Sequence, residues 1–100
     1  MREILKEAIS RYGDDMQITV AIEELSELTK ELCKYKRGEG KKLNIAEEMA
    51  DVRIMLDQLE IIFDNSEDVQ DWYKYKVNRL KSRMAIEYRA KLKEFGKRLC

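Results

Sequence analysis

No proline occurs among the 100 residues of this chain, and its four glycines stand at positions 13, 38, 40 and 96. Because proline and glycine are the residues that most disfavour a helix interior, the long segments between these glycines can form helices of many turns. Charged residues make up 40% of the chain, which is typical of long helices rather than of strands. We therefore predict an all-α fold.

Apolar residues recur with helical spacing in four segments, which glycine-rich or polar stretches separate. The predicted helices cover 2–12, 14 to about 37, 44 to about 64, and 67 to beyond 92. Asp14 and Asn44 are expected to cap the second and third helices, with Gln17 and Glu47 at the capping-box positions. Ser66 is expected to cap the fourth. Four helices with short connections predict a four-helix bundle in a single domain, 1–100.

A chain of this size has one small core, so self-association would add to its stability. The segment 85–100 leaves three alternatives open: it lengthens the fourth helix, packs on a neighbouring subunit, or frays after Gly96. Cys33 and Cys100 have no close spacing, which favours free thiols and a cytoplasmic protein. No apolar run approaches the roughly 18 residues that a membrane span needs, so no membrane association is expected.

Two segments of the chain repeat the same pattern of acidic and apolar residues. The segment "AIEELSELTKEL" (21–32) aligns with "IAEEMADVRIML" (45–56) at a constant offset of 24 residues. Their apolar stripes correspond: Ala21, Leu25, Leu28 and Leu32 in the first, and Ile45, Met49, Val52 and Leu56 in the second. The same offset pairs Glu24 with Glu48, and Glu27 with Asp51. These acids lie beside the stripes, so four carboxylates can converge if the two helices pack together.

A solvated acidic face is the simpler interpretation of such acids, since charged residues are mostly exposed. It is weakened here because none of the four acids has a basic residue four positions later, and Glu27 is followed by Glu31. A divalent cation would relieve this repulsion. The absence of histidine excludes the common zinc and di-iron motifs and the Ser-His-Asp arrangement. Carboxylates alone favour Mg²⁺, with Mn²⁺ as a substitute, and Mg²⁺ often shares its coordination with substrate phosphates.

The two motifs "ELSE" (24–27) and "EMAD" (48–51), with twenty residues between them, resemble the signature of the MazG-like all-α nucleoside triphosphate pyrophosphohydrolases. The resemblance extends from about Asp14 to Met84 and includes "YKYKVNRLKSR" (73–83), which is similar to the basic segment of small phage-type and bacterial members. The resemblance implies a helical bundle that assembles as a homodimer or homotetramer. It also implies hydrolysis of a nucleoside triphosphate to a nucleoside monophosphate and pyrophosphate.

On this resemblance, Glu24, Glu27, Glu48 and Asp51 would hold Mg²⁺, and one of them would help to activate the attacking water. Lys76, Arg79 and Arg83 share one face of the fourth helix and could bind substrate phosphates. The resemblance also places Asn78 near the substrate, although Asn78 points away from that face in a helical wheel. A solvated basic face remains the alternative for all of these cations.

A second class of function is a non-catalytic helical module that binds nucleic acid or protein through the fourth helix. Residues 71–100 contain ten Lys and Arg against three acids, with several tyrosines among them. The first seventy residues are acidic, ten against seventeen, which weakens the attraction to nucleic acid. Nucleotide hydrolysis is therefore the leading hypothesis, and no motif indicates which base or sugar is preferred.

Overall fold

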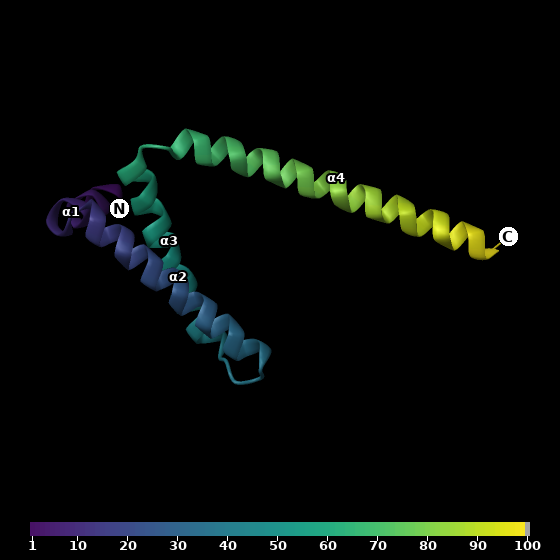
Figure 1. Ribbon diagram of the computed structural model, residues 1–100, viewed down its shortest axis with the longest axis horizontal. Coiled ribbons are helices and arrows are strands. Elements are labelled where there is room, and N and C mark those ends of the chain that lie inside the picture. Colours follow the sequence, from purple (N-terminus) through teal and green to yellow (C-terminus); the bar gives the residue numbers. More distant parts are fainter. Residues whose placement is uncertain (100) are drawn as a thin grey trace. The chain divides into compact units, whose positions relative to one another are not determined.

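The computed structural model describes residues 1–99, and four α-helices account for nearly all of them. The helices are α1 (Arg2–Tyr12), α2 (Asp14–Lys36), α3 (Lys42–Phe63) and α4 (Ser66–Leu99) (Figure 1). No strand occurs within residues 1–99, so the predicted all-α class is confirmed. Cys100 lies outside the described residues.

The predicted helix spans are close to the observed ones, but the predicted caps of α2 and α3 are wrong. Gly13, at φ 90°, is the N-cap of α2, and Asp14 is already helical. Lys41 is the N-cap of α3, because the helix-forming residues after it begin the helix two positions before Asn44. Glu47 therefore lies beyond the first turn, and no side chain caps either helix.

The chain divides into two compact units, Met1–Asn65 and Ser66–Cys100, which we describe separately. In the first unit, α2 packs along α3 and α1 packs on both (Figure 1). The short connection at 37–41 turns the chain back, so α2 and α3 run in opposite directions. At Gly40 an added Cβ would lie 2.7 Å from the backbone nitrogen of Tyr35, which is why this close turn requires glycine.

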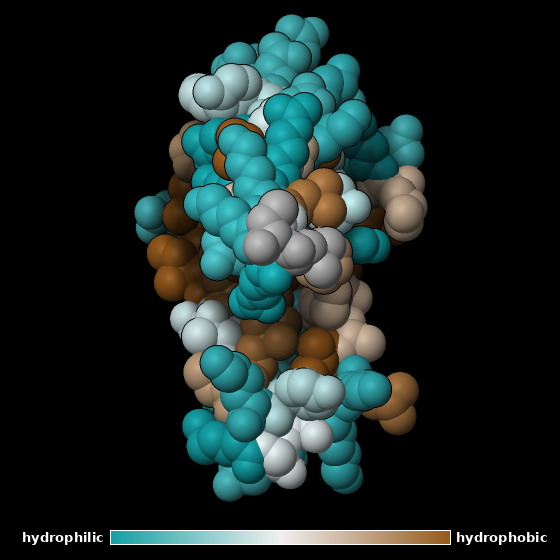
Figure 2. Space-filling model, turned by 90° about the vertical axis from the view of Figure 1, so that its right-hand side faces the viewer, coloured by the Kyte–Doolittle hydropathy of each residue, from teal (hydrophilic) through white to brown (hydrophobic). Residues whose placement is uncertain are grey.

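The interior of the first unit is small. Its buried apolar side chains are Ile9, Ala21, Val52 and Met55. Ala21 and Val52 belong to the predicted stripes, whereas Leu25 and Leu56 from the same stripes remain exposed. Hydrophobic residues accordingly reach the molecular surface between the hydrophilic ones (Figure 2).

Two glutamines lie inside this core. Gln17 and Gln58 are 6% and 4% exposed, and the Gln17 Nε2 donates a 2.7 Å hydrogen bond to the Gln58 Oε1. The Gln58 amide in turn lies 3.7 Å from the Met55 sulfur. Gln17 is thus a core residue that joins α2 to α3, and not the capping-box residue that its position in the sequence predicted.

The second unit consists of α4, a single helix of 34 residues (Figure 1). The predicted extension of this helix beyond Leu92 is confirmed, and its described part continues through Gly96. Near its start, the rings of Trp72 and Tyr75 meet edge to face at 5.8 Å. Arrangement of the four helices as one bundle stays a prediction. No helix among the described residues is both long and apolar enough to cross a membrane.

The buried glutamine pair gives a test of the α2–α3 packing. Gln17→Ala should destabilise the protein by about 1–3 kcal/mol, because it leaves the buried Gln58 carbonyl without its donor. Urea unfolding followed by circular dichroism measures this difference. Replacing both residues, Gln17→Leu with Gln58→Leu, should recover most of the loss, since neither unpaired polar group then remains.

Gln70, which is exposed on α4, supplies the matched control. Gln70→Ala should change the unfolding free energy by less than about 0.5 kcal/mol. Equal effects of Gln17→Ala and Gln70→Ala would contradict a structural role for the buried pair.

Candidate metal centre

Opposite directions of α2 and α3 determine which acids of the two motifs meet. Gln17 bonds Gln58, and their residue numbers sum to 75. In antiparallel helices this sum stays nearly constant along the interface, so Glu24 lies level with Asp51 and Glu27 level with Glu48. The repeat aligns the two motifs in the same direction along the sequence. In the structure the two helices run in opposite directions, so the first acid of each motif lies level with the second acid of the other.

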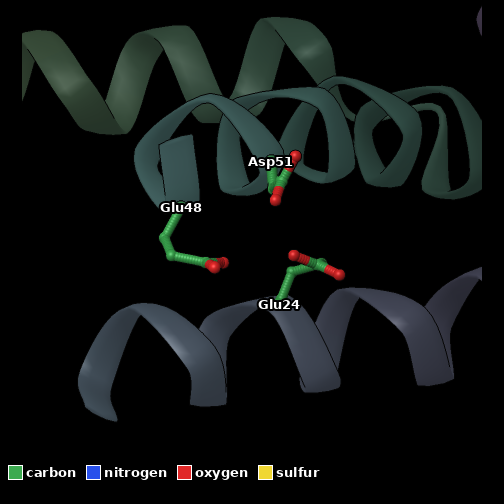
Figure 3. Close-up of side chains that lie close together, drawn as sticks. All are labelled: Glu24, Glu48 and Asp51. Atoms are coloured by element: carbon green, nitrogen blue, oxygen red, sulfur yellow. The ribbon is translucent and has the colours of Figure 1, made fainter. Parts of the chain in front are cut away.

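Three of the four predicted ligands come together between α2 and α3. Glu24, Glu48 and Asp51 each offer one carboxylate oxygen, and these three oxygens lie within 4.8 Å of one another. Figure 3 shows the Glu24 carboxyl group facing those of Glu48 and Asp51 across the space between the two helices. All three residues are half-buried. The cluster therefore lies at the edge of the small core, between the apolar stripes and the solvent-exposed surface.

Glu27 does not belong to this group of three. It is exposed, one turn along α2 from Glu24, although it is near enough to act electrostatically on both Glu24 and Glu48. A role for Glu27 as a fourth ligand therefore remains a prediction from the sequence.

One oxygen of Glu48 lacks any hydrogen-bond partner. Its Oε2 atom is buried, and no donor satisfies it. Within residues 1–99, none of the lysines and arginines forms an ion pair with Glu24, Glu48 or Asp51. A buried acceptor without a partner is unfavourable, and more so when it is charged. A bound cation would remove this penalty.

The close approach of these carboxylates also changes their pKa values. Loss of water at the helix interface raises the pKa of Glu24 above its ordinary value, and the neighbouring Asp51 carboxylate raises it further. The pKa of Glu48 is raised for the same two reasons, with Glu27 adding to the repulsion. Both shifts mean that the free protein resists having all of these groups ionised together.

The donor set fits a hard divalent cation. All of the available atoms are carboxylate oxygens, which Mg²⁺ prefers. Two ligands on opposite sides of one Mg²⁺ lie about 4.2 Å apart, twice the metal–oxygen distance, so oxygens within 4.8 Å of one another are close to the separation that one ion allows. Three protein oxygens would leave coordination positions open for water or for phosphate oxygens.

Glu31 is an acidic neighbour that the sequence interpretation did not include in the site. It is half-buried, it lies 3.5 Å from the Lys34 ammonium, and its charge contributes to the raised pKa of Glu48. The sequence did contain a signal, because Glu31 follows Glu27 by four positions on the same side of α2.

The predicted phosphate-binding residues Lys76, Asn78, Arg79 and Arg83 are all exposed on α4. The Lys76 ammonium lies 5.9 Å from the centre of the Trp72 ring, and the Arg79 guanidinium lies at the same distance from the Tyr75 ring. These cation–π contacts hold both cations along the helix surface. Binding of phosphate by these residues stays a prediction.

Comparison with known proteins identifies no relative of this chain: no family model, curated protein or solved structure matches it. The described residues thus define an all-helical protein with three converging carboxylates, and its function has to be argued from that cluster.

Raised pKa values give the site a testable pH dependence. Glu24 and Glu48 bind protons more tightly in the folded chain than in the unfolded one, so their contribution to stability is fully present below the unfolded pKa. It is lost as the pH rises from about 4, the ordinary pKa of glutamic acid, through the raised folded values. At pH 7 in a chelator, Glu48→Gln should therefore raise the Tm. The increase should shrink at pH 4, and differential scanning calorimetry at both pH values measures it.

Exposed Glu23 on α2 provides the matched control, and Glu23→Gln should leave the Tm nearly unchanged at both pH values. Millimolar Mg²⁺ should raise the Tm of the unsubstituted protein more than that of Glu48→Gln. A lower Tm for Glu48→Gln in the chelator would contradict the electrostatic description of the cluster.

Proposed function

We propose that this chain is a Mg²⁺-dependent nucleotide pyrophosphohydrolase that cleaves a nucleoside triphosphate to a nucleoside monophosphate and pyrophosphate. The observation that carries the proposal is the convergence of Glu24, Glu48 and Asp51 across α2 and α3, with one Glu48 oxygen buried and unpartnered. Repelling carboxylates at a helix interface lower the stability of the free protein. Their presence is understandable if they serve a cation and its substrate.

Nucleotides are the substrate class that suits such a centre. An oxygen-only site that leaves coordination positions open favours phosphate oxygens as the remaining ligands. The order and spacing of "ELSE" (24–27) and "EMAD" (48–51) support the same class, through their resemblance to the MazG-like enzymes. On that resemblance we also propose Glu27 as a ligand, and Lys76, Asn78, Arg79 and Arg83 as phosphate-binding residues.

The chain's carboxylates account for the proposed chemistry without a histidine. When bound, Mg²⁺ lowers the pKa of a coordinated water and neutralises charge on the phosphoryl oxygens. Glu24, Glu48 and Asp51 would hold the ion between α2 and α3. A carboxylate beside the ion would accept the proton of the attacking water. The water oxygen would bond to the α phosphorus as the bond from that phosphorus to the bridging oxygen breaks, and pyrophosphate would leave with the bridging oxygen.

A panel of ribonucleoside and deoxyribonucleoside triphosphates tests the activity. Pyrophosphate release should require Mg²⁺ and should stop in chelator, with Mn²⁺ restoring part of the rate. Glu48→Gln and Asp51→Asn should each lower kcat/KM by at least about 100-fold, since loss of a direct metal ligand should cost no less than loss of a residue that only supports one. Circular dichroism should show that both variants keep their helix content.

Glu23→Gln is again the matched control, because Glu23 is exposed on α2 and lies outside the cluster. It should retain the full rate. Folded protein that releases no pyrophosphate from any nucleotide would refute the enzymatic proposal, and full activity of Asp51→Asn would refute its assignment as a ligand.

A second candidate function is the binding of nucleic acid or protein through α4. The observation that favours it is the exposure of the basic residues of α4 together with Trp72, Tyr73 and Tyr75. Aromatic and basic side chains on one helix are typical of surfaces that bind single-stranded nucleic acid. Fluorescence anisotropy with a labelled oligonucleotide tests it. Affinity that falls steeply with salt and ignores Mg²⁺ would support this function over the enzymatic one.

A further inference from the structure

Apolar side chains form a stripe along α4, and Lys91 is a charged residue near its centre line. The stripe consists of Val69, Tyr73, Val77, Leu80, Met84, Tyr88, Leu92 and Phe95. Successive members are three or four residues apart, which places them all on one side of the helix. Every one of these residues is exposed, from 43% at Val69 to 70% at Tyr73. Most helices owe their stability to the packing of such a face, so a helix of 34 residues needs a partner for it.

The spacing of this stripe is nearly the same in both directions from Met84. Leu80 and Tyr88 are four residues from it, Val77 and Leu92 are seven and eight, and Tyr73 and Phe95 are eleven. Two identical helices in antiparallel orientation are related by a twofold axis perpendicular to them. With that axis at Met84, seven of the eight stripe residues come within one residue of an apolar stripe residue of the other helix, and Val69 has no counterpart in the stripe. A partner of unrelated sequence would not require this symmetry.

Charges along one edge of the stripe have the matching arrangement. At about 100° per residue, Lys76, Arg83, Glu87 and Glu94 lie roughly 65 to 105° from the centre of the stripe on the same side. The cations occupy the first half of this edge and the acids the second half. A perpendicular twofold axis brings this edge of one helix against the same edge of the other.

Antiparallel pairing therefore places opposite charges together. Lys76 comes opposite Glu94 of the second copy, and Arg83 comes opposite its Glu87, because both pairs of residue numbers sum to 170. Residues that face each other across an axis at Met84 have numbers that sum to 168, so both ion pairs lie within two residues of that register. Parallel pairing would instead set this edge against the opposite edge of the second copy, where Lys74 and Lys81 lie near the level of Lys76 and Arg83, and this juxtaposition of cations is unfavourable. Arg79 lies further from the stripe and has no acidic counterpart, so it remains free to bind phosphate.

We propose that α4 packs antiparallel against α4 of a second copy of this chain, with the twofold axis at Met84. The stripe is the hydrophobic contact, and the two kinds of ion pair along its edge select the orientation. This pairing goes beyond the proposed function and holds or fails independently of the metal centre, but it engages Lys76 and Arg83, so in the dimer Arg79 is the cation that stays available for phosphate.

Cysteine crosslinking distinguishes the possible arrangements of α4. In a full-length chain with Cys33→Ser and Cys100→Ser, Met84→Cys should give a covalent dimer with a short bismaleimide crosslinker. Tyr73→Cys should crosslink poorly by itself, because residue 73 faces residue 95 of the second copy. A mixture of Tyr73→Cys and Phe95→Cys chains should give the mixed dimer. Self-crosslinking of Tyr73→Cys as efficient as that of Met84→Cys would overturn the antiparallel orientation.

Sedimentation velocity provides an independent measurement. Leu80→Asp places a charge in the stripe, and it should weaken dimerisation at least about tenfold, since it removes the burial of a leucine side chain and would bury a charge instead. Ser82→Asp is the matched control, because Ser82 lies on the opposite side of α4, and it should leave the dimer unchanged. A monomeric unsubstituted chain, or a Leu80→Asp chain that remains fully dimeric, would overturn the proposal.

Discussion

Antiparallel packing of α2 on α3 is the interaction on which the rest of the first unit depends. The Gln17–Gln58 hydrogen bond lies inside this interface, and both amides would be left unsatisfied if one helix slid along the other. The bond therefore selects one register of the two helices. In that register Glu24 lies level with Asp51, so a polar contact inside the core determines where the carboxylates meet.

The carboxylate cluster destabilises the same interface. Its members raise one another's pKa values, and the buried Glu48 oxygen has no donor. Sites that are locally unfavourable in this way are often the functional ones, because an external partner supplies the missing interaction. In the proposed function this partner is a positively charged ion, and the available donors are oxygens alone. The repulsion that destabilises the interface and the proposed Mg²⁺ site therefore involve the same carboxylates.

Sequence reasoning succeeded where the signal extended over many residues. Periodicity gave the four helices and their approximate ends, and the repeat around Glu24 and Glu48 identified acids that the structure brings together. It failed where the signal was one or two residues long. Asn44 and Glu47 have the spacing of a capping box, but the residues before them favour a helix strongly enough to move its start. The spacing of Asp14 and Gln17 likewise predicts a capping box, but Gln17 donates its hydrogen bond to Gln58, which is far away in the chain.

What the sequence determined by itself is the set of helices, their apolar faces, and the acids that border those faces. These properties follow from local periodicity, which needs no knowledge of neighbouring helices. The tertiary structure decided which acids meet. The repeat aligns Glu24 with Glu48 in the sequence, whereas antiparallel packing places Glu24 level with Asp51, brings Glu48 near both and leaves Glu27 exposed. The relative direction of two packed helices is a long-range property, so it is defined only by the tertiary structure.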